Sequence, residues 1–440
     1  MYPVKMAFRE VLPHPQSLSD PVARLFESEG ELLRAVTAEH APFYERLLSD
    51  PALERLFDAG LVRTERAQVP IGDYPLVLKH RRVDFVSDWR EWPSLMLRDA
   101  ALMVCELCLE LSRRGYGALD IHPWNVLFDF SRPVFIDFAA IAPLDSAWLD
   151  EQAGRFRDYW ILPLVFIKMG HPHFARSLRK SCEVTEPIDE LLKRRELRWF
   201  PLWYQRLRRK ARANPTAFFG KLKERLEALR LSEDEEKRAG EVELHALENF
   251  DDFVRSDSRA RTLSLLLGRL RPSTLMDVGC GQGLYAMLAE RQGIKVVAID
   301  WNEARVNSLY GRVKEGGQRI LPLMLDFSIQ TLGQGRKKEF PSSTARLACD
   351  VTFMPSILPR LFFELELSFE RIADLLAAYS RRHAIVEFIE PRGPYVFKHR
   401  ESRFAAYGLE SFVKAMERHF HLSEIFEPDS SGRLLLFEKR

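Results

Sequence analysis

The segment that most constrains the fold is an apolar run that ends in three closely spaced glycines and continues into a helical pattern. It reads Thr274-Leu275-Met276-Asp277-Val278-Gly279-Cys280-Gly281-Gln282-Gly283, and Leu284 to Glu290 follow. This order predicts a strand, a tight turn and a helix N-terminus. Glycines suit the turn because a side chain would block a ligand's close approach and because positive φ can be required there. The segment predicts a ligand-binding βα unit.

The next apolar run strengthens this prediction. Lys295 to Asp300 reads as a strand that ends in a carboxylate, 23 residues after Asp277. A carboxylate at that place suits an acceptor of hydrogen bonds from both hydroxyls of an adenosine ribose. The two strands together predict a nucleoside-binding half-fold.

Two ligands compete for such a site. A dinucleotide loop requires G-x-G-x-x-G, but here Leu284 stands where the last glycine would fall. The pattern D-V-G-C-G-x-G instead resembles motif I of class I S-adenosylmethionine (SAM) methyltransferases. The resemblance implies SAM as cofactor. It also implies that one set of residues surrounds the methionine, ribose and adenine: Asp277, Gly279, Cys280, Gly281, Gly283, Asp300, Trp301, Asp326 and Phe327.

The order of the later elements agrees with that family. Arg319–Phe327, Asp350–Met354 and Arg382–Glu390 read as further strands with helical patterns between them. His419–Phe426 and Arg433–Glu438 flank a turn sequence, which signals a hairpin. We therefore expect an α/β C-terminal domain with a doubly wound, Rossmann-like, seven-stranded sheet and a terminal antiparallel hairpin.

Acceptor chemistry is weakly encoded, because methyl transfer needs alignment and, for a poorly acidic acceptor, removal of a proton. Ligands of open α/β sheets bind beyond the carboxyl ends of the strands. The catalytic candidates there are Glu390, Tyr395 and Asp350, with Ser356, Glu387 and Lys398 considered beside them. For each of them, a solvated loop or a helix–sheet contact is an equally good interpretation.

The N-terminal half carries a second signature. The segment Asp120-Ile121-His122-Pro123-Trp124-Asn125 precedes a hairpin and then Val134 to Phe138. It resembles the catalytic loop and D-F-G acid of kinase-like phosphotransferases. The resemblance implies Asp120 as the base and Asn125 and Asp137 as magnesium ligands, with ATP as a further cofactor if the domain is an enzyme.

This signature departs from the kinase pattern. Ala118 and Ala139 replace its histidine and its D-F-G glycine, and no glycine-rich phosphate loop precedes Ala35. Arg34 or Lys79 could stand in for the kinase lysine, and a short set of acids could pair with it: Glu45, Glu54 or Glu91. Phosphotransfer, a kinase-shaped binding or scaffold domain, and chance resemblance all stay open.

The chain as a whole is similar to a bacterial family of fused methyltransferases typified by rhizobial nodulation host-range proteins. The similarity rests on S-D-W-R-E-W, D-x-H-P-W-N-V-L-F, P-V-F-I-D-F and I-V-E-F-I-E-P-R. That family tends to show two histidines after the fourth strand, where this chain has Phe353 to Pro359 instead. A more distant parallel is with kinase-methyltransferases that cap surface polysaccharides, in reversed domain order. We expect a kinase-like domain at 1–182, a helical connector at 183–245 and a methyltransferase domain at 246–440.

Composition excludes several other classes. The net charge of +2 excludes the strongly basic surface that is typical of nucleic-acid-binding proteins. The basic, aromatic stretch between 193 and 212 is better interpreted as amphipathic connector helices. Five scattered cysteines indicate a reducing compartment, and the pair Cys105 and Cys108 lies in a predicted helix. No secretory signal or membrane span is recognised, so we expect a cytoplasmic protein.

The sequence therefore predicts a SAM-dependent methyltransferase acting on a small-molecule or glycan acceptor, with a kinase-like domain for acceptor selection or scaffolding. One alternative is a bifunctional kinase and methyltransferase. The other is a non-catalytic binding protein in which both folds are relics.

Overall fold

The computed structural model of the protein describes residues 11–14, 20–177, 204–206, 209, 214–229, 231, 250–331, 340–390, 401–429 and 432–440. Tyr395, Lys398, Cys182 and about two thirds of the predicted connector lie outside these residues, and the described part of the connector includes the helix Pro215–Glu227. The chain divides into two compact units. Unit 1 comprises Met1–Asp84, Leu97–Leu127 and Pro133–Leu231, and unit 2 comprises Phe85–Met96, Phe128–Arg132 and Ser232–Arg440.

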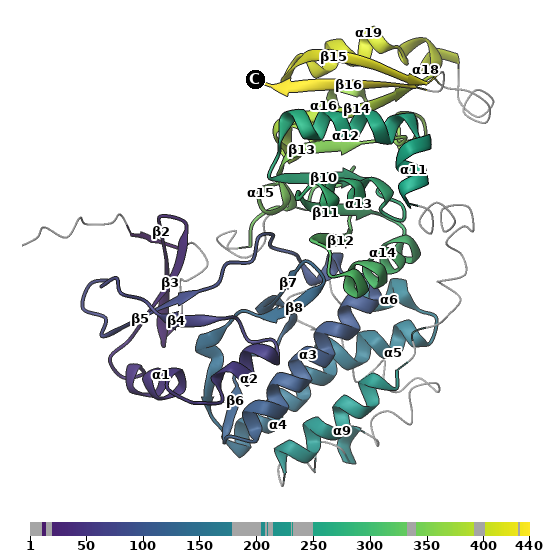
Figure 1. The fold of residues 1–440 in the computed structure, drawn as a ribbon. Coiled ribbons are helices and arrows are strands. Elements are labelled where there is room, and N and C mark those ends of the chain that lie inside the picture. Colours follow the sequence, from purple (N-terminus) through teal and green to yellow (C-terminus); the bar gives the residue numbers. More distant parts are fainter. Residues whose placement is uncertain are drawn as a thin grey trace, which may run out of the picture. The chain divides into compact units, whose positions relative to one another are not determined.

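Unit 2 is built on a seven-stranded sheet (Figure 1). Its strands, in spatial order, are β12 (Ile320–Met324), β11 (Lys295–Asp300), β10 (Thr274–Val278), β13 (Cys349–Met354), β14 (Ser380–Ile389), β16 (Gly432–Lys439) and β15 (Phe420–Asp429). The first five strands are parallel, and β16 runs antiparallel between β14 and β15. The predicted doubly wound sheet with a terminal antiparallel hairpin is confirmed.

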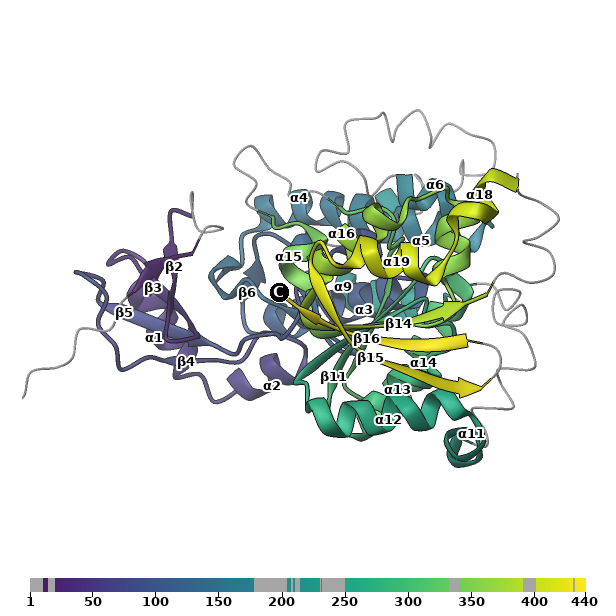
Figure 2. The same cartoon turned by 90° about the horizontal axis from the view of Figure 1, so that it is seen from above.

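Helices cover both faces of this sheet, with α12 and α13 on one side and α16 and α19 on the other (Figure 2). The α12 side also includes α14, since Leu309 and Val313 join the core cluster of α12 and α13. The helices of unit 2 are α11 (Phe250–Ser256), α12 (Ser258–Leu270), α13 (Leu284–Arg291), α14 (Glu303–Gly316), α15 (Ser343–Leu347), α16 (Phe369–Tyr379), α18 (Glu401–Ala406), α19 (Leu409–Met416) and the short π-helix η6 (Arg360–Glu364).

Two short segments from the N-terminal half complete unit 2. Phe85–Met96 holds the 3-10 turn η1 (Trp89–Glu91) and the first residues of α3 (Ser94–Ser112). The carboxylate of Glu303 accepts from the amide of Ser94 at 2.9 Å, and Asn307 accepts from the amide of Leu95 at 3.0 Å. These contacts satisfy amides that a helix start leaves without partners.

The same segment supplies the counter-charge of a buried arginine. Glu91 and Arg346 are joined by two hydrogen bonds, and their side chains are only 4% and 1% exposed. Arg346 also donates to the carbonyl oxygen of Val86 at 2.8 Å. Residues far upstream of the glycine loop are therefore part of the interior of unit 2.

Unit 1 contains a five-stranded antiparallel sheet and a helical part. The sheet order is β1 (Leu12–Pro13), β2 (Ala23–Ser28), β3 (Glu31–Val36), β5 (Leu76–His80) and β4 (Thr64–Arg66). Its helices are α1 (Ala41–Leu48), α2 (Leu53–Asp58), the remainder of α3, α4 (Ser146–Phe156), α5 (Leu162–Lys168), α6 (Pro172–Ser177) and α9 (Pro215–Glu227), with the π-helix η4 (Arg157–Ile161) between α4 and α5.

The predicted catalytic-loop region adopts short strands and turns, and all of it belongs to unit 1 except Phe128–Arg132. They are β6 (Tyr116–Ala118), η2 (Pro123–Asn125), β7 (Val126–Asp129), β8 (Arg132–Phe135), η3 (Phe138–Ala140) and β9 (Ile141–Pro143). The predicted hairpin before Asp137 is confirmed as the pair β7 and β8. The kinase-like character of this unit stays a prediction.

Candidate cofactor site

The glycine loop joins β10 to α13 and follows the sequence prediction closely. Gly279, Gly281 and Gly283 have φ of 73°, 55° and 84°, a region that glycine adopts without strain. A Cβ on Gly279 would lie 2.6 Å from the side chain of Ile357, and one on Gly283 would lie 2.4 Å from that of Leu309. The positive φ favours glycine at both positions, and a Cβ there would also force the side chain of Ile357 or Leu309 to shift.

This packing gives a first testable result. We expect Gly283→Ala to lower the free energy of unfolding of unit 2 by roughly 1–3 kcal/mol, because alanine is strained at this φ and Leu309 must move. Gly311→Ala in α14 is the matched control, since its Cβ would meet nothing within 4 Å; alanine there should be neutral or stabilising. Urea denaturation measures both, and equal effects would contradict the loop geometry.

Asp300 ties the glycine loop to the end of β11. Its Oδ2 accepts from the amide of Gly281 at 3.1 Å, and its Oδ1 accepts from the amide of Asn302 at 2.8 Å. The side chain is 2% exposed, and Arg305 is the near cation, 4.0 Å away. Each carboxylate oxygen can accept a further hydrogen bond, so Asp300 is able to serve the loop and a sugar hydroxyl together.

Asp277 is the most unusual residue of the site. It is completely buried on β10; the backbone amide of Ala286 lies near its carboxylate, but neither oxygen has a hydrogen-bond partner of normal geometry. Burial, and then the negative charge of Asp300, raise the pKa of Asp277 to about 7. A buried carboxylate in this state is stabilised by a cation. A positively charged group at the end of β10 would therefore stabilise the charged form of Asp277.

The remaining predicted cofactor residues surround this loop in different ways. Burial and the charges of Asp277 and Asp300 raise the pKa of Cys280 well above its ordinary value, so its thiol stays neutral. Trp301, beyond β11, is 54% exposed, and the guanidinium of Arg360 lies 4.2 Å from its ring centre. The exposed ring is available to a planar ligand.

Beyond β12, Asp326 and Phe327 make local contacts. Asp326 accepts from the amide and the hydroxyl of Ser328 at 2.9 and 2.6 Å, and Phe327 is buried with its ring 5.6 Å from that of Tyr379. Both residues follow the carboxyl end of β12, the strand beside β11, as predicted. The side chain of Phe327, however, packs in the core.

Among the catalytic candidates, Asp350 requires a correction. It lies at the amino end of β13, where its Oδ2 accepts from the amides of Ser273 and Thr274 at 2.8 and 3.2 Å. That end of a parallel sheet is opposite the glycine loop, so Asp350 caps the start of β10 and is not a catalytic candidate. Glu390 is exposed after β14 and lies 3.5 Å from Arg433. Tyr395 lies outside the described residues.

The structure brings together two other residues that the sequence had singled out. Ser356 follows β13 with a φ of 57°, and its amide and hydroxyl both donate to Oε2 of Glu387 at 2.9 Å. Glu387 is buried on β14, and its Oε1 lies 3.4 Å from Arg259 of α12. Arg259 was missed, because nothing in its local sequence links it to β14. This cluster lies at the carboxyl ends of β13 and β14, next to Ile357, which covers Gly279.

In unit 1, the three predicted phosphotransfer residues lie close together, and each has a polar neighbour, although Oδ1 of Asp137 makes no hydrogen bond. Asp120 contacts Arg155 and His122, each at 3.0 Å. The side-chain amide of Asn125 donates to the carbonyl oxygen of Asp120 at 2.9 Å. Asp137 lies 3.3 Å from the guanidinium of Arg34.

The predicted acidic partners of a lysine stand-in are wrong. The pairs are Glu45 with Arg66 and Glu54 with Arg63, while Glu91 binds Arg346 in unit 2. Lys79 lies 2.8 Å from Glu31. Arg34 donates to His80 and Asp20 in addition to its contact with Asp137.

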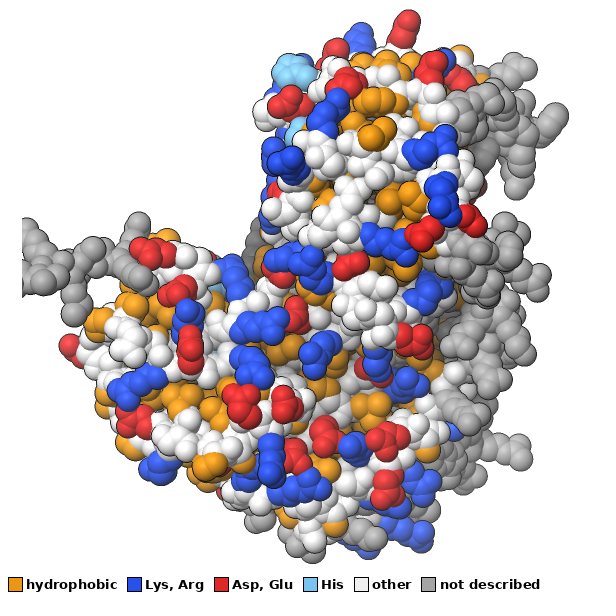
Figure 3. All heavy atoms as spheres, viewed as in Figure 1, with side chains coloured by type: hydrophobic (Ala, Val, Ile, Leu, Met, Phe, Trp, Pro, Cys, Tyr) orange, Lys and Arg blue, Asp and Glu red, His pale blue; other side chains and the backbone are white. Residues whose placement is uncertain are grey.

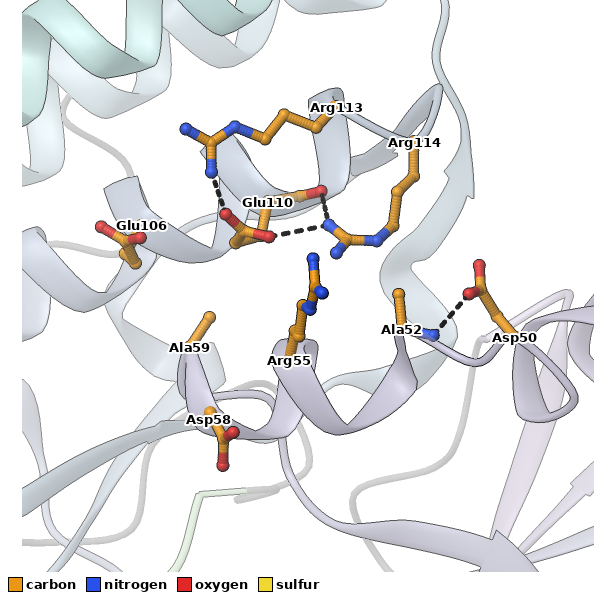
Figure 4. A pocket seen from close by; sticks show the side chains of 9 residues that line it. All are labelled: Asp50, Ala52, Arg55, Asp58, Ala59, Glu106, Glu110, Arg113 and Arg114. Atoms are coloured by element: carbon orange, nitrogen blue, oxygen red, sulfur yellow. Dashed lines mark hydrogen bonds and ion pairs between the residues drawn. The ribbon is translucent and has the colours of Figure 1, made fainter.

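A pocket of about 740 Å³ opens in unit 1, away from both sets of predicted residues (Figure 4). Its charged lining residues are Asp50, Arg55, Asp58, Glu106, Glu110, Arg113 and Arg114. Figure 4 shows Glu110 engaging both Arg113 and Arg114, so the two cations are held by one carboxylate. Charges of both signs line the pocket, and they favour no single ligand class.

Other predicted features can be compared with the described residues. Cys105 and Cys108 are buried in α3, and burial raises the pKa of each thiol. Within the described ranges, no cluster of three His, Cys, Asp or Glu side chains could hold a metal ion. No described helix has the length and apolar character to span a membrane. On the face drawn in Figure 3, basic and acidic side chains are interspersed.

Comparisons with known proteins give distant similarities. No protein-family model matches the chain. The nodulation protein NoeA of Rhizobium meliloti (strain 1021) is 23% identical, and the match covers 96% of this chain and 95% of NoeA. The PH0226 protein from Pyrococcus horikoshii OT3 has a TM-score of 0.33 at 16% identity, covering 42% of this chain and 90% of its own.

Two further solved structures are similar at the same level. Magnesium protoporphyrin IX methyltransferase (ChlM) from Synechocystis PCC 6803, solved with bound SAM, has a TM-score of 0.30 at 17% identity, covering 43% of this chain and 84% of its own. WbdD has a TM-score of 0.30 at 14% identity, covering 44% and 40% respectively. Because these similarities are so low, a function has to be argued from the residues of the site.

Proposed function

We propose that this chain is a SAM-dependent methyltransferase whose cofactor binds at the carboxyl ends of β10 and β11. The observation that carries the proposal is the completely buried carboxylate of Asp277 beside Asp300 at the glycine loop, which makes no hydrogen bond of normal geometry. SAM carries a sulfonium and an ammonium group, whereas a dinucleotide presents an anionic pyrophosphate. Two neighbouring carboxylates attract the first ligand and repel the second.

Each group of the site has a distinct part in this proposal. Asp277 attracts the cationic methionine end, Asp300 accepts hydrogen bonds from the ribose, and the exposed Trp301 flanks the adenine. Bound SAM supplies an activated methyl group to a nucleophilic acceptor. The chain orients the acceptor and receives its proton, if the acceptor needs to lose one.

We place the acceptor beside the cluster of Ser356, Glu387 and Arg259, because those residues share the carboxyl edge of the sheet with the glycine loop. Glu390 stays a candidate for proton removal, and so does Tyr395 outside the described residues. The acceptor class we favour is a small molecule or a glycan. The similarity of the sequence to the fused methyltransferase family and the near-zero net charge support this class.

Asp300→Ala tests the adenosine half of the site. We expect the variant to lose at least tenfold in affinity for SAM, for S-adenosylhomocysteine and for 5′-methylthioadenosine, because all three carry the ribose that Asp300 binds. Isothermal titration calorimetry with each ligand, and with NAD as the competing cofactor, measures the effect. Asp252→Asn, on an exposed turn of α11, is the control and should bind as the wild type does.

Methyl transfer itself requires an acceptor. Incubation of the full chain with methyl-labelled SAM and an extract of its source organism, followed by mass analysis, identifies the product. SAM binding without any labelled product would favour the non-catalytic alternative. Absence of SAM binding, or preference for NAD, would reject the proposal.

A further inference from the structure

Glu387 has a buried carboxylate with a partner on each oxygen. The residue is 1% exposed on β14. Its Oε2 accepts from both the amide and the hydroxyl of Ser356 at 2.9 Å, and its Oε1 lies 3.4 Å from Nη1 of Arg259. Arg259 is fixed in turn, because its Nη2 donates to Oδ2 of Asp257 at 3.2 Å. A Cβ on Gly432 of β16 would lie 3.0 Å from Oε1 of Glu387, so glycine there leaves room for the carboxylate. The structure thus gives this buried charge a counter-charge, donors and space.

The turn that Glu387 holds is strained. Ser356 follows β13 with a φ of 57°, which lies in the left-handed region. A residue with a side chain adopts this conformation at a cost in free energy and keeps it where surrounding contacts hold it. Ser356 is exposed, so packing around its own side chain does not supply that hold. The two hydrogen bonds to Glu387 do, because they fix the backbone amide and the side chain of Ser356 together.

The residues after this turn contact both ends of the proposed cofactor site. Ile357 packs on the glycine loop, since its Cγ2 would lie 2.6 Å from a Cβ on Gly279. Three residues further on, the guanidinium of Arg360 lies 4.2 Å from the ring centre of Trp301. The amide of Leu361 donates to the carbonyl oxygen of Ile357 at 3.0 Å, so the turn and the start of η6 are joined. A change in the turn would therefore move both contacts.

From this geometry we infer that Glu387 is a positioning residue for the proposed cofactor site. It acts through Ser356: it holds the turn in its left-handed conformation, and the turn keeps Ile357 on the glycine loop and Arg360 over the ring of Trp301. The inference rests on the proposed function, because it assigns Glu387 to that same site. Glu387 is not assigned the removal of a proton, because its buried carboxylate serves Ser356 and Arg259.

Glu387→Gln in the full-length protein tests the inference. Glutamine keeps the size of the side chain but has one oxygen, so its amide group must face either the donors of Ser356 or the guanidinium of Arg259. We expect the affinity for S-adenosylhomocysteine, measured by calorimetry, to fall about tenfold, because small displacements in a site are costly. Hydrogen exchange of the Leu361 amide, without ligand, should become several-fold faster. Glu417→Gln, exposed at the end of α19, is the matched control and should show neither effect.

A double-variant cycle tests whether Glu387 acts through the turn. Glycine adopts a positive φ without strain, so in a Ser356→Gly background the further loss caused by Glu387→Gln should shrink to less than about threefold. Losses that are the same in both backgrounds would overturn the inference, because Glu387 would then be only a structural ion-pair partner.

The wild type separates the two levels of the argument. A wild type that does not bind S-adenosylhomocysteine would reject the proposed function and this inference with it. A wild type that binds it, with a folded Glu387→Gln variant that binds equally well, would overturn the inference alone. If Glu387→Gln does not fold, as urea denaturation would show, Ser356→Ala removes only the hydroxyl bond and should change both measurements in the same direction.

Discussion

Asp277→Asn is expected to make the unliganded protein more stable and to weaken its binding of SAM. The folded-state pKa of Asp277 is about 7, against an ordinary value of 3.8. The folded state therefore holds the proton more tightly than the unfolded chain does, and wild-type stability falls as the pH rises from about 4 to about 7. Asparagine removes this dependence.

The size of the effect follows from the same difference in pKa. At about 1.4 kcal/mol per pH unit, the gain in unfolding free energy could approach roughly 4 kcal/mol above pH 7 and should vanish near pH 4. Urea denaturation of wild type and variant at several pH values between 4 and 8 measures it. An advantage of the variant that is the same at every pH would contradict the assignment.

Ligand affinities of the Asp277→Asn variant distinguish the role of Asp277 from that of Asp300. Asp277→Asn should weaken S-adenosylhomocysteine, which carries the amino-acid group, by at least tenfold, and should leave 5′-methylthioadenosine nearly unchanged. Wild-type affinity for SAM should rise with pH through about 7, as the carboxylate becomes charged. Equal losses for both ligands would mean that the substitution disturbs the loop as a whole.

Glu91→Ala is the second prediction with a large expected effect. It leaves Arg346, 1% exposed, without its counter-charge. Breaking a buried ion pair from one side costs about 3–5 kcal/mol. We expect the unfolding transition of unit 2 to shift to much lower urea concentration, as followed by circular dichroism and tryptophan fluorescence.

Two controls accompany this substitution. Glu54→Ala breaks the exposed pair of Glu54 with Arg63, whose side chains are 68% and 51% exposed, and should cost less than about 1 kcal/mol. The double variant Glu91→Ala/Arg346→Met should recover much of the loss, because it removes the unpaired charge. A single Glu91→Ala variant as stable as the wild type would show that Arg346 finds another partner.

Local sequence signals predicted the sheet of unit 2 and the glycine loop at which we propose the cofactor binds. The glycine loop, the carboxylate at the end of β11 and the terminal hairpin each depend on residues adjacent in sequence, and the structure confirms these elements. Asp350 was misplaced because it stands at the start of β13, and a strand pattern does not state which end carries the site.

The long-range pairs could not be predicted. Arg346 meets Glu91 across most of the chain, and Arg34 of β3 meets Asp137, which lies between β8 and η3. Each of these side chains has several oppositely charged residues nearer in sequence, so spacing offers no preference. The choice among them is made by the packing of distant elements.

The incorporation of Phe85–Met96 into unit 2 has a consequence for synthesis on the ribosome. This stretch, with the apolar Trp89 and Trp92, emerges long before the strands that will enclose it. Until Arg346 and α14 have been translated, the Glu91 carboxylate and the amides of Ser94 and Leu95 lack their native partners. Folding of unit 2 must therefore wait for the carboxyl-terminal half of the nascent chain. A ribosomal stall after Met96 but before Arg346 would leave an aggregation-prone intermediate that chaperones can bind.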